Sequence, residues 1–532
     1  MHIPCRTREA VISMKGRTNA SGGKGISTTL KVRVNGKNSD NVGGTVTVKK
    51  GGTTVATGTT ATGGVCSLDL GLESGSFDVA YAKGSNIASG SVDLTLGATA
   101  ILDLNISYAK YWGIIIDESN TSTSGAITYP QTLTVNGASV PNAAYGKTPA
   151  KSAANGFDMG GWANDDLIKG IKPVKSDGAS SPSFTDAPTD ASQWTTGTEY
   201  FTEFPFMWLS ITKSSSKITV MMSDADTRPD STFQCWAFAK ANDGVSDTEI
   251  QNAASTVSRD SLMNGGSNAT YSRCFRLGCF LMSGDTSGFY SKANTAATTA
   301  QLNKYWVGAN ARGNQYDGMS FAQWVHIQAL FLILYKDRNS QAAHSSGLSG
   351  ASSVDSSNAP LSTTAYGMAG STSSARNAFF WIHDIWGNYY QYIASVFIST
   401  GNNMSNIYHT LSRMANPANW DNNSWNSTSD YALMRSKGFD TGSMPSDAAG
   451  FYTSACGSNG AGFLKSSDSS AASETTCWPD YGHANYGSYN AYFLAVGGRY
   501  SDGAGAGLFY ACVDYDSTYS SSDCRARLSF RG

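Results

Sequence analysis

The first hundred residues alternate between apolar and polar positions with a period of two. Alternation over about four to eight residues is typical of a strand with one buried face. Seven segments between residues 27 and 107 follow this pattern, each closed by Gly, Asn or Ser: TLKVRV, GTVTVKK, TTVATG, VCSLDL, SFDVAYA, GSVDLTL and AILDLNI. Short strands at a spacing of about ten residues predict a small β-sandwich over this region.

A second pattern begins near Tyr111, where aromatic residues become frequent. Continuous apolar runs bounded by turn residues indicate strands that are buried on both faces. Between residues 130 and 200, Gly, Ser, Pro and Asp dominate, which indicates long loops. We predict strands in the following segments: YWGIIID, GAITYP, the hairpin pair EYFTEFPFMWLSI and SKITVMMS, CWAFAKA, and RCFRLGCFLMSG.

The clearest helix is predicted for Ser320 to Lys336, SFAQWVHIQALFLILYK. Ser320 and Gln323 have the spacing of a capping box, which satisfies two free amides at a helix N-terminus. Apolar side chains on almost every side indicate a helix buried in a larger core. The run is shorter than the ~18 apolar residues needed to cross a bilayer, and it contains His326, so we expect no membrane insertion.

The end of the chain contains two continuous apolar runs and one alternating run. Residues 491–498, AYFLAVGG, and 506–513, AGLFYACV, are expected to form strands that are buried on both faces. In residues 524–530, CRARLSF, the alternation predicts that Arg525 and Arg527 face the solvent while the apolar residues face inward. We interpret these three strands as a scaffold.

The composition indicates a turn-rich β protein. Only 15% of the 532 residues are charged, while Gly alone occurs 56 times. A formal net charge of −2 provides no basic surface, which argues against binding to nucleic acid or to an anionic membrane. The nine cysteines are odd in number and scattered, unlike a disulfide framework, and their spacings do not match a zinc motif.

Polar segments rich in tyrosine separate the C-terminal strands. Eight of the 26 tyrosines fall between Trp478 and Ser520, where an even distribution would give about two. Tyrosine offers a large contact area with only two torsions to fix, and Ser, Gly, Asn and Asp add adaptable hydrogen bonds, as in antibody paratopes. Four tyrosines are interpreted as packing residues instead: Tyr492, Tyr500, Tyr510 and Tyr519.

The remaining polar residues of these segments lack a strand pattern. We expect them to cluster on one exposed surface that binds a ligand, and we call this set the candidate face. Its members are Tyr481, His483, Asn485, Tyr486, Tyr489, Arg499, Ser501, Asp502, Ala504, Asp514, Tyr515 and Asp516. Neither catalytic residues nor a metal site are predicted among them.

Several segments resemble one known family. The order of YWGIIID, TEFPFMW, the helix ending in YKDRNSQ, IWGNYYQY and the closing VGGRYSDGAGAGLFY and RARLSF is similar to that in the phage-tail variable proteins of diversity-generating retroelements. The resemblance covers about residues 108–532 and is most specific at Val496–Phe509 and Trp386–Asn388. It implies a C-type-lectin-like domain, of the type shared with formylglycine-generating enzymes.

Pattern and resemblance together predict a mainly β fold with some α structure, an α+β protein. The expected domains are a flexible leader (1–26), an immunoglobulin-like β-sandwich (27–107), an intermediate β and loop region (108–199), and a C-type-lectin-like domain (200–532) whose variable region spans about 478–520.

The resemblance implies a receptor-binding protein of the virion tail tip, made in the cytoplasm of the host bacterium. In that family, adenine-directed mutagenesis diversifies the exposed residues while the scaffold stays constant, and this determines host tropism. The implied partners are a bacterial surface receptor, either protein or glycan, and other phage tail proteins, within a homotrimer. No enzymatic activity and no cofactor are expected, although a structural Ca²⁺ ion is left open.

Two segments carry oxygen ligands of the kind that calcium prefers. They are WDNN at 420–423 and SDADTRPD at 223–230, and neither has the spacing of a known calcium loop. Two other functions stay open. One is an enzyme, either of the formylglycine-generating type or a glycan depolymerase, which would depend on single residues such as Cys512 or Asp421. The other is a structural baseplate or decoration protein that binds only virion proteins.

Overall fold

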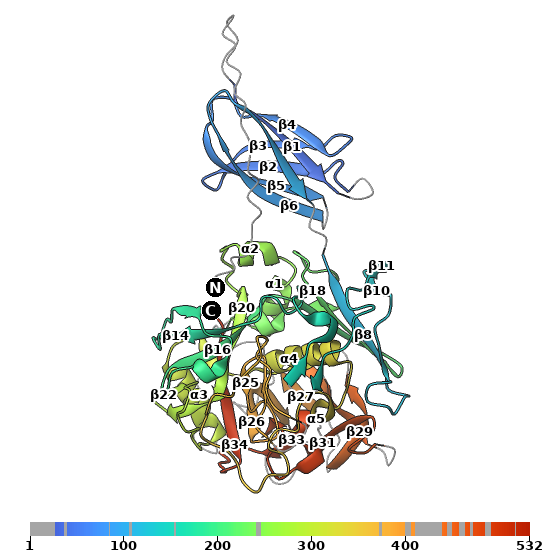
Figure 1. Cartoon of the computed structure of the whole chain (residues 1–532), viewed down its shortest axis with the longest axis vertical. Helices are drawn as coiled ribbons and strands as arrows, with labels where there is room; N and C mark the ends of the chain where they lie inside the picture. Colours follow the sequence, from blue (N-terminus) through green and yellow to red (C-terminus); the bar gives the residue numbers. More distant parts are fainter. Residues whose placement is uncertain are drawn as a thin grey trace, which may run out of the picture. The chain divides into compact units, whose positions relative to one another are not determined.

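The chain forms two compact units, Met1–Ala109 and Lys110–Gly532 (Figure 1). The predicted mainly β fold is confirmed, since strands account for 42% of the chain and helices for 13%. The predicted leader, 1–26, lies outside the described residues. The computed structural model describes residues 27–36, 40–83, 86–105, 109–153, 156–240, 246–371, 375–399, 406–409, 439–443, 449–456, 463–468, 472–484, 491–516 and 518–532.

The smaller unit consists of two sheets that share one hydrophobic core. The first sheet has the order β4 (Val65–Asp69), β1 (Thr29–Asn35), β7 (Thr99–Asn105). The second has the order β3 (Thr53–Thr59), β2 (Thr45–Lys50), β5 (Gly75–Lys83), β6 (Asn86–Leu94). Alternate residues of both sheets, such as Val32, Val79 and Leu102, are buried in the same cluster. The seven predicted strands are therefore present.

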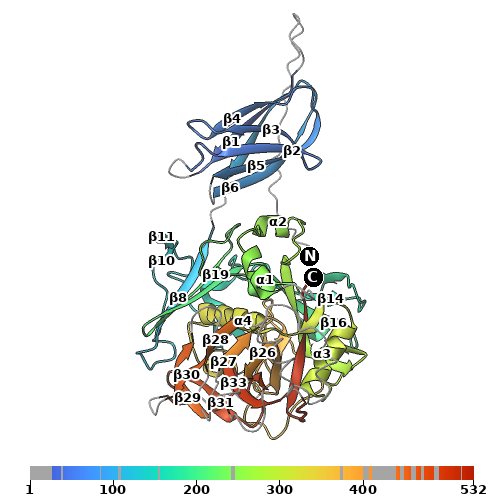
Figure 2. The same cartoon turned by 180° about the vertical axis from the view of Figure 1, so that it is seen from behind.

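The larger unit is organised around one long mixed sheet. Its main path has the order β15 (Phe184–Asp186), β14 (Lys172–Ser176), β16 (Glu199–Pro205), β20 (Cys274–Leu281), β34 (Cys524–Phe530), β26 (Tyr390–Ser399), β32 (Ala491–Gly497), β33 (Gly507–Tyr515), β31 (Trp478–Ala484), β29 (Ala449–Cys456), β30 (Leu464–Asp468). Three further strands pair at its side: β23 (Tyr316–Gly318), β27 (Asn406–His409) and β28 (Phe439–Ser443). The last described strand, β34, thus lies inside the sheet, between β20 and β26. In Figure 2 it is the dark red strand that runs between the labels β26 and α3.

A second sheet of the larger unit contains the predicted strand pairs. Its order is β19 (Phe233–Gln234), β17 (Trp208–Ser214), β18 (Lys217–Ser223), β8 (Tyr111–Asp117), β9 (Ile127–Thr128). The pairing of β8 with β9 confirms one prediction. The predicted hairpin is confirmed only for β17 and β18, because the run EYFTEFPFMWLSI is split and its first half forms β16 of the main sheet. The predicted strand CWAFAKA is wrong, because residues 236–238 form a 3-10 helix. A short apolar run indicates burial and does not by itself distinguish a strand from a helical turn.

Short hairpins occupy parts of the chain between these sheets. Two of them lie in the region that was predicted to form long loops, residues 130–200. Their strands are β10 (Thr132–Val135) with β11 (Ala138–Pro141), and β12 (Lys151–Ala153) with β13 (Gly156–Asp158). Two more follow later in the chain: β21 (Ser283–Asp285) with β22 (Gly288–Tyr290), and β24 (Ala378–Phe379) with β25 (Ile382–His383).

The predicted central helix is confirmed. Helix α4 (Phe321–Tyr335) begins with the capping box of Ser320 and Gln323, and all its residues are buried. Burial lowers the pKa of His326, on this helix, to about 3. None of the helices within the described ranges is long and apolar enough to cross a membrane. Within the described residues, the other α-helices are α1 (Asp247–Ala253), α2 (Arg259–Met263), α3 (Leu302–Ala311) and α5 (Ser340–Ala343).

The orientation predicted for two arginines of β34 is wrong. Arg525 and Arg527 do not face the solvent: they are 4% and 0% exposed, respectively. The reason is the position of β34 in the middle of the sheet, where both of its faces are covered. The buried guanidinium of Arg527 donates hydrogen bonds to Gln391 Oε1 at 3.0 Å and to the carbonyls of Gly278 and His383 at 2.9 and 2.8 Å.

Candidate ligand-binding face

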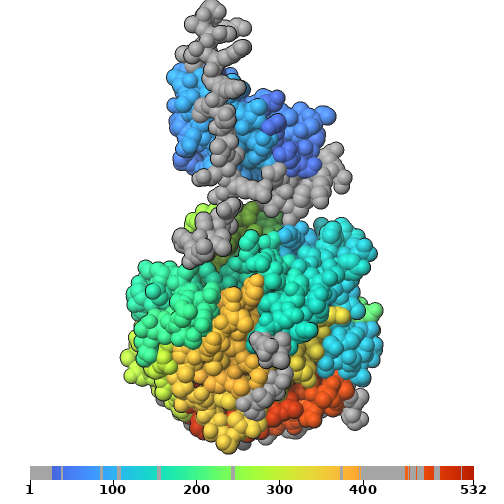
Figure 3. Space-filling view, viewed as in Figure 1, coloured from blue at the N-terminus to red at the C-terminus, as the bar shows by residue number. Residues whose placement is uncertain are grey.

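The scaffold predicted for the C-terminal strands is present as buried structure. Strand β34 is buried along its whole length, and β33 is buried from Gly507 to Val513. Side chains of these strands, including Ala495, Tyr510 and Ala526, belong to one hydrophobic cluster. In Figure 3 red-orange residues of the last part of the chain reach the surface at the lower edge of the larger unit. Buried strands therefore support this part of the surface.

The structure places nine of the twelve residues of the candidate face. Ser501 and Ala504 are exposed, and the other seven are partly buried: Tyr481, His483, Arg499, Asp502, Asp514, Tyr515 and Asp516. Tyr481 and His483 belong to β31, while Asp514 and Tyr515 belong to the end of β33, so these four are strand residues. Predicted face residues Asn485, Tyr486 and Tyr489 lie outside the described residues.

Arg499 and Asp502 form one polar group on the candidate face. Arg499 Nη1 pairs with Asp523 Oδ2 at 2.6 Å, and the Arg499 backbone amide donates to Asp502 Oδ2 at 2.9 Å. Tyr390 donates to Asp502 Oδ1 at 3.2 Å and itself accepts from Tyr510 at 3.1 Å. This network connects the loop after β32 to side chains of β26 and β33.

The backbone of the loop that carries Ser501 and Ala504 is held by hydrogen bonds from two other segments of the chain. Gln341 Nε2 donates to the Gly503 carbonyl at 3.0 Å. The Gly350 amide donates to the Tyr500 carbonyl at 2.6 Å. Two exposed side chains are thus presented by a backbone whose carbonyls are held by neighbouring segments.

Aromatic side chains form a second group on this face. Tyr515 stacks on Tyr519 with ring centroids 4.2 Å apart, and it meets the edge of Tyr392 at 6.3 Å. Tyr519 is 38% exposed, so its interpretation as a packing residue is wrong. Its loop leaves it outside the strand, stacked over Tyr515 rather than inserted into the core.

A β-bulge positions the end of β33. Phe493 of β32 pairs with Tyr515, whereas Ala495 pairs with Cys512, so β33 has one residue more than β32 between the two pairs. Such a bulge redirects side chains and increases local twist. It explains why Tyr515 reaches the side of the sheet on which Tyr390 and Cys512 pack.

Three side chains of β31 and β33 form a third group. Strand β31 runs parallel to β33 in a register that places His483 beside Cys512, and Asp514 follows two residues later. His483 Nδ1 is paired with Asp514 Oδ2. Burial, together with the nearby Asp514 carboxylate, raises the pKa of the Cys512 thiol well above its usual range. Sequence spacing offered no signal for this group, because His483 and Cys512 lie on different strands.

The other candidate ion ligands are engaged by protein groups. Asp224 accepts from the Lys110 amide at 2.6 Å. Asp226 accepts from the Asp260 amide at 2.7 Å, and Asp230 accepts from the Asn136 amide at 2.8 Å. The segment at 420–423 lies outside the described residues.

A buried carboxyl lies directly beneath this face. Asp480 of β31 is fully buried and accepts from the Phe509 amide at 2.7 Å through Oδ2. Its Oδ1 has no hydrogen-bond partner among the described residues. A Cβ at Gly507 would overlap this carboxyl, which explains the glycine at the start of β33. Burial raises the pKa of Asp480 well above its usual range, which favours the protonated form.

Replacing Asp480 by asparagine is expected to stabilise the protein at pH 8 and to have little effect near pH 4. An acid whose pKa is raised by folding loses stability as the pH rises above its unfolded pKa, near 4, by up to about 1.4 kcal/mol per pH unit. Asparagine keeps the shape and carries no charge. The measurement is denaturant unfolding followed by tryptophan fluorescence between pH 4 and 8. A stability difference that does not grow with pH would contradict a buried, protonated Asp480.

Comparisons with known proteins give no relative for this chain. No protein-family model matches it, and no curated protein shows significant similarity to it.

Proposed function

We propose that this chain is a receptor-binding protein of a phage tail, which recognises a bacterial cell surface through the candidate face. In this proposal the smaller unit is an immunoglobulin-like sandwich and the larger unit a C-type-lectin-like domain. The virion carries the chain as a homotrimer next to other tail proteins. Recognition is noncovalent, and several copies on one virion increase the overall avidity through effective concentration.

The observation that carries the proposal is the contrast between scaffold and face. Strands β33 and β34 are buried, whereas the residues between and at the ends of the C-terminal strands combine Tyr, Ser, Asp and Arg with partial or full exposure. Side chains of this kind on a rigid backbone are typical of binding surfaces, because little conformational entropy is lost on contact. This contrast supports ligand binding by the face.

The enzyme alternative has weaker support. Cys512 and Cys524 are 1% and 0% exposed, and burial raises the pKa of Cys524 to about 12. A nucleophilic or redox cysteine needs access to its substrate and a lowered pKa. A structural baseplate protein remains the other alternative, and it differs from a receptor-binding protein in showing no affinity for cells.

Substitution of the stacked tyrosines is expected to weaken binding of the protein to cells. The probe is the fluorescently labelled full chain, incubated with a panel of intact bacterial strains. Replacing Tyr515 or Tyr519 by alanine is expected to lower the apparent affinity for a bound strain about 10-fold, the loss typical of an aromatic contact at an interface. The matched control is Tyr145→Ala, since Tyr145 is 56% exposed and lies outside the candidate face.

Three outcomes decide between the functions. Unchanged cell binding by the Tyr515→Ala/Tyr519→Ala double variant would contradict the face as the binding surface. Affinity for virion proteins together with no binding to any strain would favour the structural alternative. The diversified part of the proposal has its own readout: sequencing of the gene in a propagated population should show substitutions at positions 480–490, 499–505 and 511–516, with 491–498, 506–510 and 525–530 constant.

A further inference from the structure

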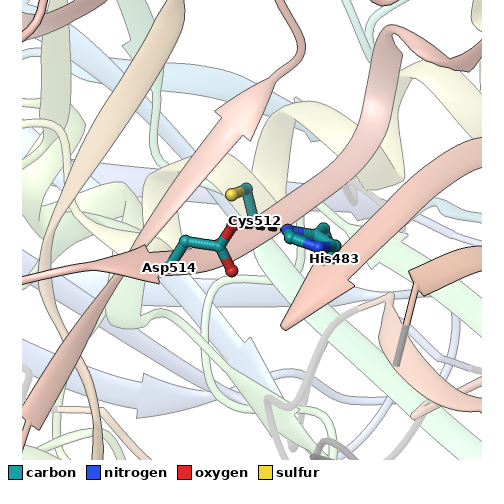
Figure 4. Close-up of side chains that lie close together, drawn as sticks. All are labelled: His483, Cys512 and Asp514. Carbon is teal, nitrogen blue, oxygen red and sulfur yellow. Dashed lines mark ion pairs between the residues drawn. The ribbon is translucent and has the colours of Figure 1, made fainter. Parts of the chain in front are cut away.

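Three potential metal ligands meet at the end of β31 and β33. His483 Nδ1 or Nε2, Cys512 Sγ and one Asp514 carboxylate oxygen all lie within 4.8 Å of one another (Figure 4). His483 and Asp514 already touch through Nδ1 and Oδ2. The parallel register of the two strands produces this arrangement, since it sets His483 directly beside Cys512. Backbone pairing, and not a flexible loop, therefore brings the three groups together.

The three groups form a donor set suited to zinc. Imidazole nitrogen, thiolate sulfur and carboxylate oxygen bind zinc at about 2.0–2.3 Å, which places tetrahedral ligands about 3.3–3.7 Å apart. The observed separations are within about 1.5 Å of that, a change that side-chain rotation can supply. A soft thiolate together with imidazole favours zinc over calcium or magnesium, which prefer oxygen ligands only.

Charge balance is compatible with a divalent cation here, since Cys512 needs to carry a charge only when it binds an ion. A thiolate at Cys512 beside the Asp514 carboxylate would place two negative charges next to each other in a site where Cys512 is 1% exposed. Like charges at such distances repel strongly when they are partly shielded from water. One divalent cation neutralises both charges while the neutral imidazole of His483 completes the set of three protein ligands.

We propose that His483, Cys512 and Asp514 bind one zinc-class divalent ion, with a fourth coordination position open towards the solvent. The side chains of His483 and Asp514 are 35% and 21% exposed, so the ion would be reached from the surface. Three protein ligands with an open position are the arrangement in which zinc accepts water or a ligand group. In this position the ion also connects β31 to β33 at the candidate face. Because His483 and Asp514 are themselves members of that face, the site belongs to this sequence and would be lost in variants that replace either residue.

The fourth position defines a class of ligand. A carboxylate or imidazole group from a bound molecule can replace the water on zinc, because both are ordinary zinc ligands. The ion site itself does not depend on receptor binding. Metal binding and cell binding can therefore be measured and can fail separately.

Cobalt titration of the full chain tests the site. The protein is treated with a chelator under reducing conditions, dialysed, and titrated with Co²⁺, whose bond to a thiolate gives a near-ultraviolet charge-transfer absorption. We expect a band that saturates at one equivalent and disappears when Zn²⁺ is added. The Cys512→Ser variant should lose the band, whereas Cys66→Ser, which removes a buried thiol of the smaller unit, should keep it.

Substitution of the buried Cys512 could impair folding, so variants of the two partly exposed ligands provide a second test. His483→Ala and Asp514→Asn are expected to weaken Zn²⁺ binding by more than about 100-fold, since even indirect partners of zinc ligands contribute 10- to 100-fold. Saturating Zn²⁺ should raise the melting temperature of the unsubstituted chain and leave that of these variants unchanged. The proposal is overturned if no charge-transfer band appears, if Cys512→Ser retains it, or if His483→Ala binds zinc as tightly as the unsubstituted chain.

Discussion

Replacing Arg312 by methionine is expected to lower the free energy of unfolding of the larger unit by about 3–5 kcal/mol. Arg312 follows helix α3 and pairs with Glu199 of β16 through both terminal nitrogens, at 2.5 and 2.9 Å. Both side chains are 3% exposed. Removal of the arginine leaves a buried carboxylate without its counter-charge. The guanidinium also lies over the rings of Tyr290 and Tyr316, at 4.2 and 4.0 Å, and these contacts would be lost as well.

The measurement is urea unfolding followed by tryptophan fluorescence. All 12 tryptophans lie in the larger unit, the first at Trp112, so the signal reports that unit alone. A single domain is stable by only about 5–15 kcal/mol, and the expected loss is therefore a large fraction of the total. The double variant Arg312→Met/Glu199→Gln should recover most of it, because no buried charge is left unpaired.

An exposed pair in the same sheet provides the control. Lys172 and Asp186 are 2.6 Å apart, with side chains 46% and 55% exposed. Pairs of this kind contribute about 0–1 kcal/mol because water screens them, so Lys172→Met should change stability by less than about 1 kcal/mol. Equal losses in Arg312→Met and in the double variant would show that the arginine acts through its ring contacts and not through Glu199.

Local patterns were sufficient to predict the strands of the smaller unit and the central helix. All seven strands of the smaller unit fall where alternation indicates them. In most of them alternate side chains are buried, although β3 has no buried residue. The central helix was predicted with its capping box, since both the apolar run and the cap are contiguous in sequence. Such signals involve residues within one turn or one strand, so no knowledge of the partner element is needed.

Features that depend on strand order could not be predicted in the same way. Alternation in CRARLSF indicates one wet face, yet β34 is covered on both sides because it pairs between β20 and β26. Those two neighbours come from parts of the chain more than 100 residues away. The local sequence does not show which strands will flank β34. Whether an arginine in such a strand is buried can therefore be decided only when its hydrogen-bond acceptors are known.

The composition of the C-terminal segments indicated which residue types the candidate face contains, but it did not indicate which side chains contact one another. Tyr515 and Arg499 lie among other polar and aromatic side chains, in agreement with the expected enrichment. Asp523, which pairs with Arg499, and the cluster of His483 with Cys512 were missed. The first depends on β26 pairing with both β32 and β34, and the second depends on the register of β31 and β33; both are tertiary features.

The same buried polar groups that complicate prediction also connect the face to the core. Gln391 lies opposite Val496 of β32, and its side chain is held by Arg527. The Gly387 amide donates to the carbonyl of Gly497, two residues before Arg499, at 3.0 Å. A defect at Arg527 is therefore transmitted through Gln391 to the strand that supports the candidate face.

Arg527→Met is expected to cost about 4 kcal/mol of unfolding free energy. Three buried acceptors lose a charged donor in this variant, namely the Gln391 side chain and the carbonyls of Gly278 and His383. Each unsatisfied acceptor costs roughly 1–3 kcal/mol, and part of this is offset because the arginine no longer has to be desolvated. That desolvation is substantial, since burial lowers the pKa of Arg527 to about 10.

Arg527→Lys separates the charge from the hydrogen bonds. Lysine retains the positive charge but donates from a single nitrogen, so it cannot reach three acceptors in the planar arrangement that the guanidinium provides. We expect a loss of about 2–3 kcal/mol, smaller than for methionine but well above that of a conservative exchange. Urea unfolding by tryptophan fluorescence measures both variants.

The neighbouring arginine of the same strand supplies the matched comparison. Arg525 is also buried, but its Nη1 donates to the carbonyls of Cys524 and Ser521 in its own segment, at 2.7 and 3.3 Å. Loss of these local bonds does not detach β34 from β20 or β26, so Arg525→Met should cost less than half as much as Arg527→Met. If the two variants cost the same, Arg527 contributes burial alone, and the network through Gln391 does not hold the central strands together.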